Sequence, residues 1–129
     1  MKNTEDCIVT VTNIQSSGDM TDTITERGKG TYRKSRDARY IKYETDEAKV
    51  MIKAEPERVM VRRGGDTGSQ MCYELGKWTD FSYKTPYGEM KMSIFTESMN
   101  ISDYAIRLVY ILDTGIDKIR NNMVIEIKG

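Results

Sequence analysis

The sequence contains no histidine, and it has only two cysteines and two prolines in 129 residues. Without histidine, Ser-His-Asp and Cys-His catalysis in their usual forms, histidine-ligated zinc sites and histidine pH switches are excluded. An enzyme built from this chain would have to work with Asp, Glu, Lys, Arg, Tyr or Cys alone. The composition therefore favours a non-enzymatic protein, for which we expect no metal and no cofactor.

Long apolar runs are also missing, since no stretch approaches the ~18 residues of a membrane-spanning helix. Near the start, Glu5 and Asp6 stand where a signal peptide would be apolar. The two cysteines, Cys7 and Cys72, lie far apart without CxxC spacing, which favours two free thiols over a disulfide. These features predict a cytoplasmic protein with one domain over residues 1–129, as a monomer or a homodimer.

The sequence also has no net charge, because twenty Lys and Arg residues balance twenty Asp and Glu residues. A neutral total disfavours nucleic-acid binding without excluding a local basic patch. Such a patch is available in Arg27, Lys29 and Arg33, which share one face of a predicted strand close to aromatic residues. It could bind RNA or a protein partner, or it could be a solvated basic face that protects a sheet edge.

What the chain does contain is a series of short runs rich in Val, Ile, Thr and Tyr, separated by turn residues. The runs recur about every ten residues, a pattern typical of an all-β sandwich or barrel. Short connections favour antiparallel neighbours. We predict an all-β fold, an antiparallel up-and-down, closed or nearly closed barrel of about 8–10 strands. A helical turn within residues 97–103 is the expected exception, and the glycine-rich residues 64–68 are expected to form a turn rather than a phosphate loop.

The clearest single element is a hairpin over residues 78–96. Its two strands flank the turn Thr85-Pro86-Tyr87-Gly88, in which proline presets φ and glycine can adopt positive φ. After the turn, Met90 and Met92 alternate with polar residues, so both are expected to pack into the core.

Several strings in and around this hairpin carry a resemblance to a known family. They are Gly30-Thr31-Tyr32, Tyr40-Ile41-Lys42-Tyr43-Glu44, Arg63-Gly64, Met71, Gly76, Tyr83-Lys84-Thr85-Pro86-Tyr87-Gly88 and Thr96. Together they resemble the YwiB-like family of small bacterial proteins over nearly the whole chain. The resemblance implies a calycin-like, lipocalin-like β-barrel in the cytoplasm, and it implies no particular activity.

The candidate site residues follow from strand alternation. Tyr32, Tyr43, Tyr73, Tyr83 and Tyr104 share faces with apolar neighbours and are expected to point inward, either as core filling or as a polar lining for a ligand. Arg63 shares its face with Val59 and Val61, so it should lie at a barrel mouth. There it could anchor a ligand, or it could pair with Glu26, Glu44 or Glu74.

Our leading hypothesis is a binder of a small apolar or amphipathic molecule at the barrel mouth. Its site would be formed by the residues Tyr32, Tyr43, Arg63, Tyr73, Tyr83, Thr85 and Tyr87. Three alternatives remain open: an interaction module that uses Arg27, Lys29 and Arg33, an enzyme that uses tyrosine, arginine and a carboxylate, and a barrel filled entirely by its own side chains.

Overall fold

Residues 4–64 and 69–129 are described by a computed structural model, in which the Tyr83 side chain is the one further omission. Most of the predicted turn at residues 64–68 therefore lies outside the described residues. Over the described part no helix is long and apolar enough to cross a membrane. Its regular elements are ten strands: β1 (Thr4–Ser17), β2 (Met20–Lys34), β3 (Arg39–Glu44), β4 (Lys49–Glu55), β5 (Arg58–Arg63), β6 (Ser69–Glu74), β7 (Trp78–Thr85), β8 (Gly88–Ile101), β9 (Ala105–Asp113) and β10 (Lys118–Lys128).

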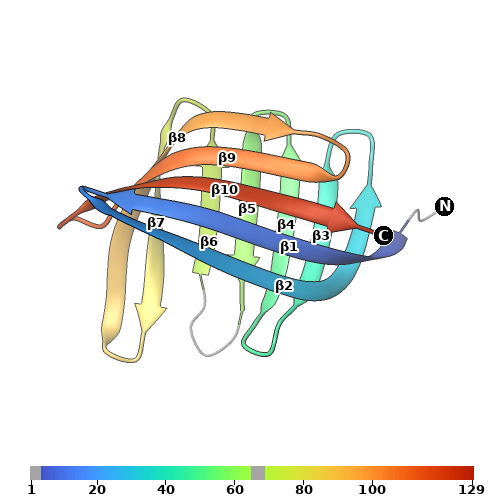
Figure 1. Ribbon diagram of the computed structural model, residues 1–129, viewed down its shortest axis with the longest axis horizontal. Coiled ribbons are helices and arrows are strands. Elements are labelled where there is room, and N and C mark those ends of the chain that lie inside the picture. Colours follow the sequence, from blue (N-terminus) through green and yellow to red (C-terminus); the bar gives the residue numbers. More distant parts are fainter. Residues whose placement is uncertain (1–3, 65–68) are drawn as a thin grey trace.

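The strands form an up-and-down barrel, which confirms the predicted fold class (Figure 1). Each strand pairs antiparallel with the next, and β1 pairs with β10 to close the circle. Closure is weakest between β6 and β7, which among the described residues share one register pair, Ser69 with Tyr83. A hydrogen bond from the Thr79 hydroxyl to the Cys72 carbonyl adds a second link there. The barrel is thus nearly closed.

The barrel is folded sharply at β2, so that the long strands β1, β2, β8, β9 and β10 run across β3–β7 (Figure 1). Residues 29–34 of β2 pair with β3, whereas residues 20–28 pair only with β1 in the described structure. At this corner a Cβ atom on Gly28 or Gly30 would collide with the backbone carbonyl of Glu44 or Lys42, respectively. Glycine is required because only a residue without a side chain permits such a close approach.

The core occupies the inner faces of the strands, where residues alternate as the sequence predicts. Its most deeply buried side chains include Val9, Ile41, Val59, Ile94, Ile106, Leu108 and Ile125. Along the same inner faces, Ile24 and Met90 are 48% and 46% exposed. The barrel interior therefore opens at this end, which we call the mouth. The prediction that Met90 packs into the core is wrong, because its strand extends beyond the packed part of the barrel.

Two other local expectations are corrected. The helical turn predicted within residues 97–103 does not form, because β8 continues to Ile101 and pairs with β9 after a bulge between Thr96 and Ser98. The bulge absorbs the break in alternation that suggested a turn. Tyr104 is 51% exposed and does not point into the core; its ring packs against Tyr32, with centroids 5.4 Å apart.

Candidate functional site

A cavity of about 170 Å³ lies inside the barrel and opens toward the mouth. It is slightly larger than the engineered cavity of about 150 Å³ that binds benzene in another protein, and smaller than the ~300 Å³ at which drug-sized pockets begin. Its aliphatic lining residues are Val11, Val50, Ile52, Val61 and Ile125. The polar, aromatic and sulfur-containing residues that line it are Glu26, Tyr43, Arg63, Ser69, Met71, Tyr73, Tyr110 and Met123.

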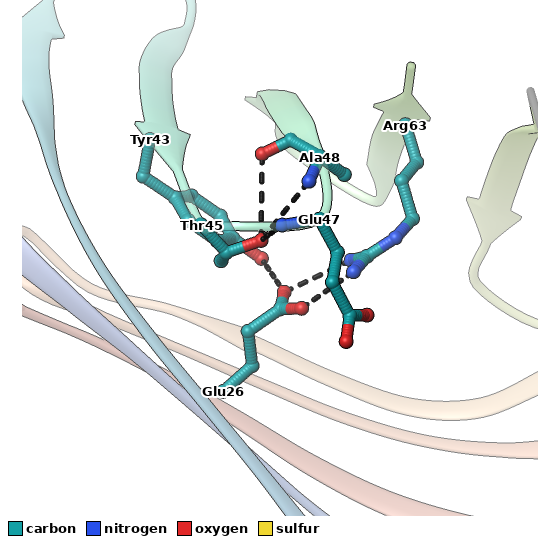
Figure 2. Close-up of polar contacts among 6 residues, drawn as sticks. All are labelled: Glu26, Tyr43, Thr45, Glu47, Ala48 and Arg63. Atoms are coloured by element: carbon teal, nitrogen blue, oxygen red, sulfur yellow. Dashed lines mark hydrogen bonds and ion pairs between the residues drawn. The ribbon is translucent and has the colours of Figure 1, made fainter. Parts of the chain in front are cut away.

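Three of these side chains form a hydrogen-bonded cluster at the mouth, the Glu26–Arg63–Tyr43 clasp (Figure 2). The guanidinium of Arg63 donates from Nη1 to Glu26 Oε1 at 2.9 Å and from Nη2 to Oε2 at 2.5 Å. The hydroxyl of Tyr43 donates to Oε1 at 2.8 Å. The clasp connects β2 with β5, although β3 and β4 lie between them in the sheet. It therefore ties two separate parts of the mouth together.

Strand alternation and one turn position the clasp. Arg63 follows Val59 and Val61 on the inner face of β5, as predicted, and Glu26 lies on the inner face of β2. Beside them the β3–β4 turn is fixed by the Thr45 hydroxyl, which accepts hydrogen bonds from the amides of Glu47 and Ala48 at 3.2 and 3.1 Å (Figure 2). This turn follows directly after Tyr43 and Glu44 at the end of β3.

The clasp is electrically neutral as a unit. The hydrogen bonds from Arg63 hold the pKa of the Glu26 carboxyl below its ordinary value, although burial acts in the opposite direction. Burial, and then the hydrogen bond to Glu26, raise the pKa of Tyr43. Of the two sequence interpretations of Arg63, the ion pair with Glu26 is confirmed. Since Glu26 occupies the fork formed by Nη1 and Nη2, Arg63 does not present that fork to a ligand anion.

Two tyrosines form the inner wall of the cavity. The rings of Tyr73 and Tyr110 meet edge to face, with centroids 4.8 Å apart and an interplanar angle of 63°. Tyr73 is only 2% exposed, and its hydroxyl donates to the thioether of Met71 at 3.8 Å. A thioether is a weak acceptor. Because burial raises the pKa of Tyr73, its hydroxyl stays a neutral donor that an oxygen acceptor would satisfy better.

Of the predicted site residues, the structure brings Tyr43, Arg63 and Tyr73 together in the cavity. Tyr32 lies toward the opposite end, buried beneath Tyr104. The β7–β8 turn lies at the mouth end, but neither of its predicted residues lines the cavity. The Thr85 hydroxyl donates to the Gly88 carbonyl at 2.9 Å, and Tyr87 is 99% exposed.

The Tyr83 prediction lies outside the described residues, since only the backbone of that residue is placed. Conversely, sequence reasoning did not nominate Tyr110, Met71 or Ser69 as ligand-binding residues, and it considered Glu26 only as a partner for Arg63. Alternation placed Tyr110 with Ile106 and Leu108, and Met71 with Tyr73, so their inward direction was available. Which inward residues border empty space depends on how the strands cross, and no local pattern encodes this.

Other sequence features occupy separate places. Arg27 and Lys29 are exposed on the outer face of β2, and the Arg33 guanidinium lies 4.3 Å from the centroid of the Tyr40 ring. Cys7 and Cys72 are free thiols, as predicted. Among the described residues, no three Cys, Asp or Glu side chains are grouped so as to hold a metal ion.

Comparisons with known proteins agree with the fold. A family model described as a domain of unknown function (DUF1934) matches residues 9–125. The crystal structure of the ywiB protein from Bacillus subtilis is similar, with a TM-score of 0.87 and 23% identity over 100% of this chain and 94% of that chain. The YwiB-like resemblance predicted from the sequence is thus confirmed, and at this identity the likeness shows the fold alone. Comparison with curated proteins gives no match.

Proposed function

The chain belongs to the DUF1934 family of domains of unknown function, and we propose, from its own cavity, that it is a non-enzymatic cytoplasmic binder of a small apolar or amphipathic molecule. The observation that carries the proposal is the 170 Å³ cavity with Tyr73 in its wall. There the buried Tyr73 hydroxyl donates to the Met71 thioether, a weak acceptor, and it also has the Tyr110 side chain as a hydrogen-bonding neighbour. A cavity of this kind gains both apolar contact and a better hydrogen bond when a ligand fills it.

The lining defines the chemistry of the ligand. Walls built largely of aliphatic, aromatic and thioether side chains, and a volume near that of a benzene-sized cavity, favour a compact apolar body of one ring or a short branched chain. The neutral clasp gives no reason for the ligand to carry a charge. A single acceptor oxygen, as in a ketone, ester or ether, would satisfy Tyr73. A longer ligand would extend toward Ile24 and Met90 at the mouth.

The same geometry argues against catalysis. The ionised groups that line the cavity, Glu26 and Arg63, are bound to each other. The raised pKa values of Tyr43 and Tyr73 keep both phenols protonated. No lining group is therefore a free acid or base poised near neutral pH.

Methionine methyl groups provide the test. We would label them with ¹³C and titrate the protein with cyclohexanone, which has an acceptor oxygen, and with methylcyclohexane, which has none. The Met71 and Met123 signals, from the cavity, should shift and saturate, while the signal of the exposed Met20 stays in place. Tyr73→Phe should remove a several-fold preference for the ketone, since one hydrogen bond is worth about 1 kcal/mol.

Two Val→Phe variants, one inside the cavity and one outside it, separate the loss of the cavity from a general disturbance of the structure. Val61→Phe places a ring in the cavity and should abolish the shifts, whereas Val109→Phe, at a half-buried position on the outer face of β9, should preserve them. The proposal is wrong if neither probe moves the Met71 and Met123 signals up to its solubility limit. It is also wrong if Val61→Phe binds as well as the unmodified protein.

A further inference from the structure

The outer face of β2–β6 carries a second arrangement, unconnected with the cavity. Cross-strand pairing aligns two rows of side chains on this face. In one row Arg33, Tyr40, Lys53, Met60 and Cys72 are neighbours, and in the other Thr31, Lys42, Met51, Arg62 and Gln70. Neither row contains a carboxylate, although the chain as a whole is neutral. These two rows, which we call the cationic face, thus carry positive charge alone, and the rows that flank them contain Glu44, Glu55 and Glu74.

Between the two rows lies a groove of about 200 Å³. Met51 and Met60 lie in it together with Tyr40, and Lys42, Lys53 and Arg62 surround them. Met51 is 47% exposed, which is high for a methionine in the middle of a sheet. The groove therefore combines an apolar floor with cationic edges, from β3 across to β6 (Figure 1 shows these strands side by side).

Two of the cations on this face, Arg33 and Lys53, lie against the ring of Tyr40. The Arg33 guanidinium lies 4.3 Å from the Tyr40 ring centroid, and the Lys53 ammonium lies 5.7 Å from it. Among the described residues, neither Lys42 nor Arg62, which flank Met51, makes an ion pair. Their charges are available to carboxylates from outside the chain.

We propose that the cationic face binds an acidic segment of a partner protein, which places one large apolar side chain in the groove between Met51 and Met60. Methionines adapt to the shape of an incoming side chain, which suits such a contact. Each surface ion pair adds little on its own. The apolar side chain therefore provides most of the affinity, and the surrounding cations select acidic neighbours and speed the encounter.

A protein segment fits this face better than single-stranded nucleic acid. Modules that bind single strands offer free aromatic rings on which bases stack, whereas the Tyr40 ring already has the Arg33 guanidinium 4.3 Å from its centroid. The thioethers of Met51 and Met60 offer the polar edges of a base almost no hydrogen bonding, and burying those edges unpaired is costly. An apolar side chain has no such cost.

Fluorescence anisotropy with three probes tests the proposal. The probes are a short labelled peptide of glutamates around a central phenylalanine, the same peptide with serine at its centre, and a labelled single-stranded oligouridylate. The phenylalanine peptide should bind, and the serine peptide should bind roughly tenfold more weakly, because it leaves the groove unfilled. The oligouridylate should bind more weakly than the phenylalanine peptide at the same salt concentration.

Two charge-matched double variants complete the test. Lys42→Glu with Arg62→Glu should reduce binding of the phenylalanine peptide at least tenfold, and Lys118→Glu with Lys128→Glu, at exposed positions of β10, should leave it unchanged. Any one of four results would overturn the proposal: no binding of this peptide, equal binding of the serine peptide, tighter binding of the oligouridylate, or equal losses in the two double variants.

Discussion

At the residue scale, the molecule depends on a carboxylate and a guanidinium that meet across the mouth of the barrel. Glu26 and Arg63 belong to strands that are not sheet neighbours, and their side chains are only 24% and 34% exposed. A half-buried charge that lost its partner would be left poorly solvated. The clasp thus joins two strands across the mouth, and it would also set the polarity that the proposed ligand meets on entry.

A double-mutant cycle measures this link. Arg63→Ala and Glu26→Ala should each lower the free energy of unfolding by about 1–3 kcal/mol, because each leaves a charged hydrogen-bonding group without its partner. The double variant should lose less than the sum, with a coupling energy of at least about 1 kcal/mol. Urea unfolding provides the values. Arg62→Ala, at the neighbouring exposed position, should cost less than about 0.5 kcal/mol; a coupling energy near zero would show that the clasp does not stabilise the fold.

The ionisation of Glu26 predicts a pH dependence. Its pKa in the folded protein lies below the ordinary value of 4.5, chiefly because Arg63 donates hydrogen bonds to it. Its ionisation therefore contributes stability above pH 4.5, and this contribution is lost as the pH falls through the folded pKa. The difference in unfolding free energy between the unmodified protein and Glu26→Gln should shrink as the pH is lowered from neutral toward this range.

Urea unfolding at a series of pH values checks that prediction. The control is Glu44→Gln, whose carboxylate is exposed and 3.8 Å from an exposed lysine, and which should alter stability by less than about 0.5 kcal/mol. A Glu26→Gln difference that stayed constant from neutral to acidic pH would contradict the assignment.

At the scale of elements, β2 determines the shape of the barrel. Among the described residues its first half pairs with β1 alone and borders the mouth, and its second half pairs with both β1 and β3. The change occurs at Gly28 and Gly30, where β3 passes too close for any side chain. Near this turn of the strand, Glu26 meets Tyr43 of β3 and Arg63 of β5 at the mouth of the cavity.

Substitution of these glycines tests the role of the corner. Gly30→Ala should destabilise the protein by about 2–3 kcal/mol, because its methyl group meets rigid backbone rather than a movable side chain. Gly64→Ala is the matched control, since its Cβ would lie 3.8 Å from the nearest atom, the Lys49 carbonyl oxygen. Thermal unfolding compares them. If both variants melted at the same temperature, the close approach at Gly30 would not be essential to the fold.

Much of this architecture could be predicted from the sequence. Alternation of apolar residues identified the strands and their inner faces, and turn residues marked most of their ends. The prediction of a helical turn was wrong because the bulge after Thr96 interrupts the alternation of residues in the same way as the end of a strand does. The sequence predicted that Arg63 points inward, because it follows Val61 by two residues and therefore lies on the same face of the strand. The partner of Arg63 was not predictable, because the choice among three glutamates depends on the bend at Gly28, a property of the whole barrel.

At the scale of the whole molecule, the barrel separates two surfaces with different chemistry. The interior is apolar, neutral at its mouth and small. The cationic face carries an apolar groove, and the core residues Ile41 and Ile52 border this groove. A protein that binds a small molecule inside and a partner outside would need this separation. Neither surface requires the other to be occupied.

The central claim, that the cavity holds a small molecule, is tested most directly by native mass spectrometry. The protein would be purified gently from its own cells, incubated with a small-molecule extract of those cells, and weighed under native and denaturing conditions. We expect an excess native mass that denaturation removes and that Val61→Phe fails to retain, whereas Val109→Phe retains it. A native mass equal to the bare chain, or to a whole multiple of it, would contradict the claim.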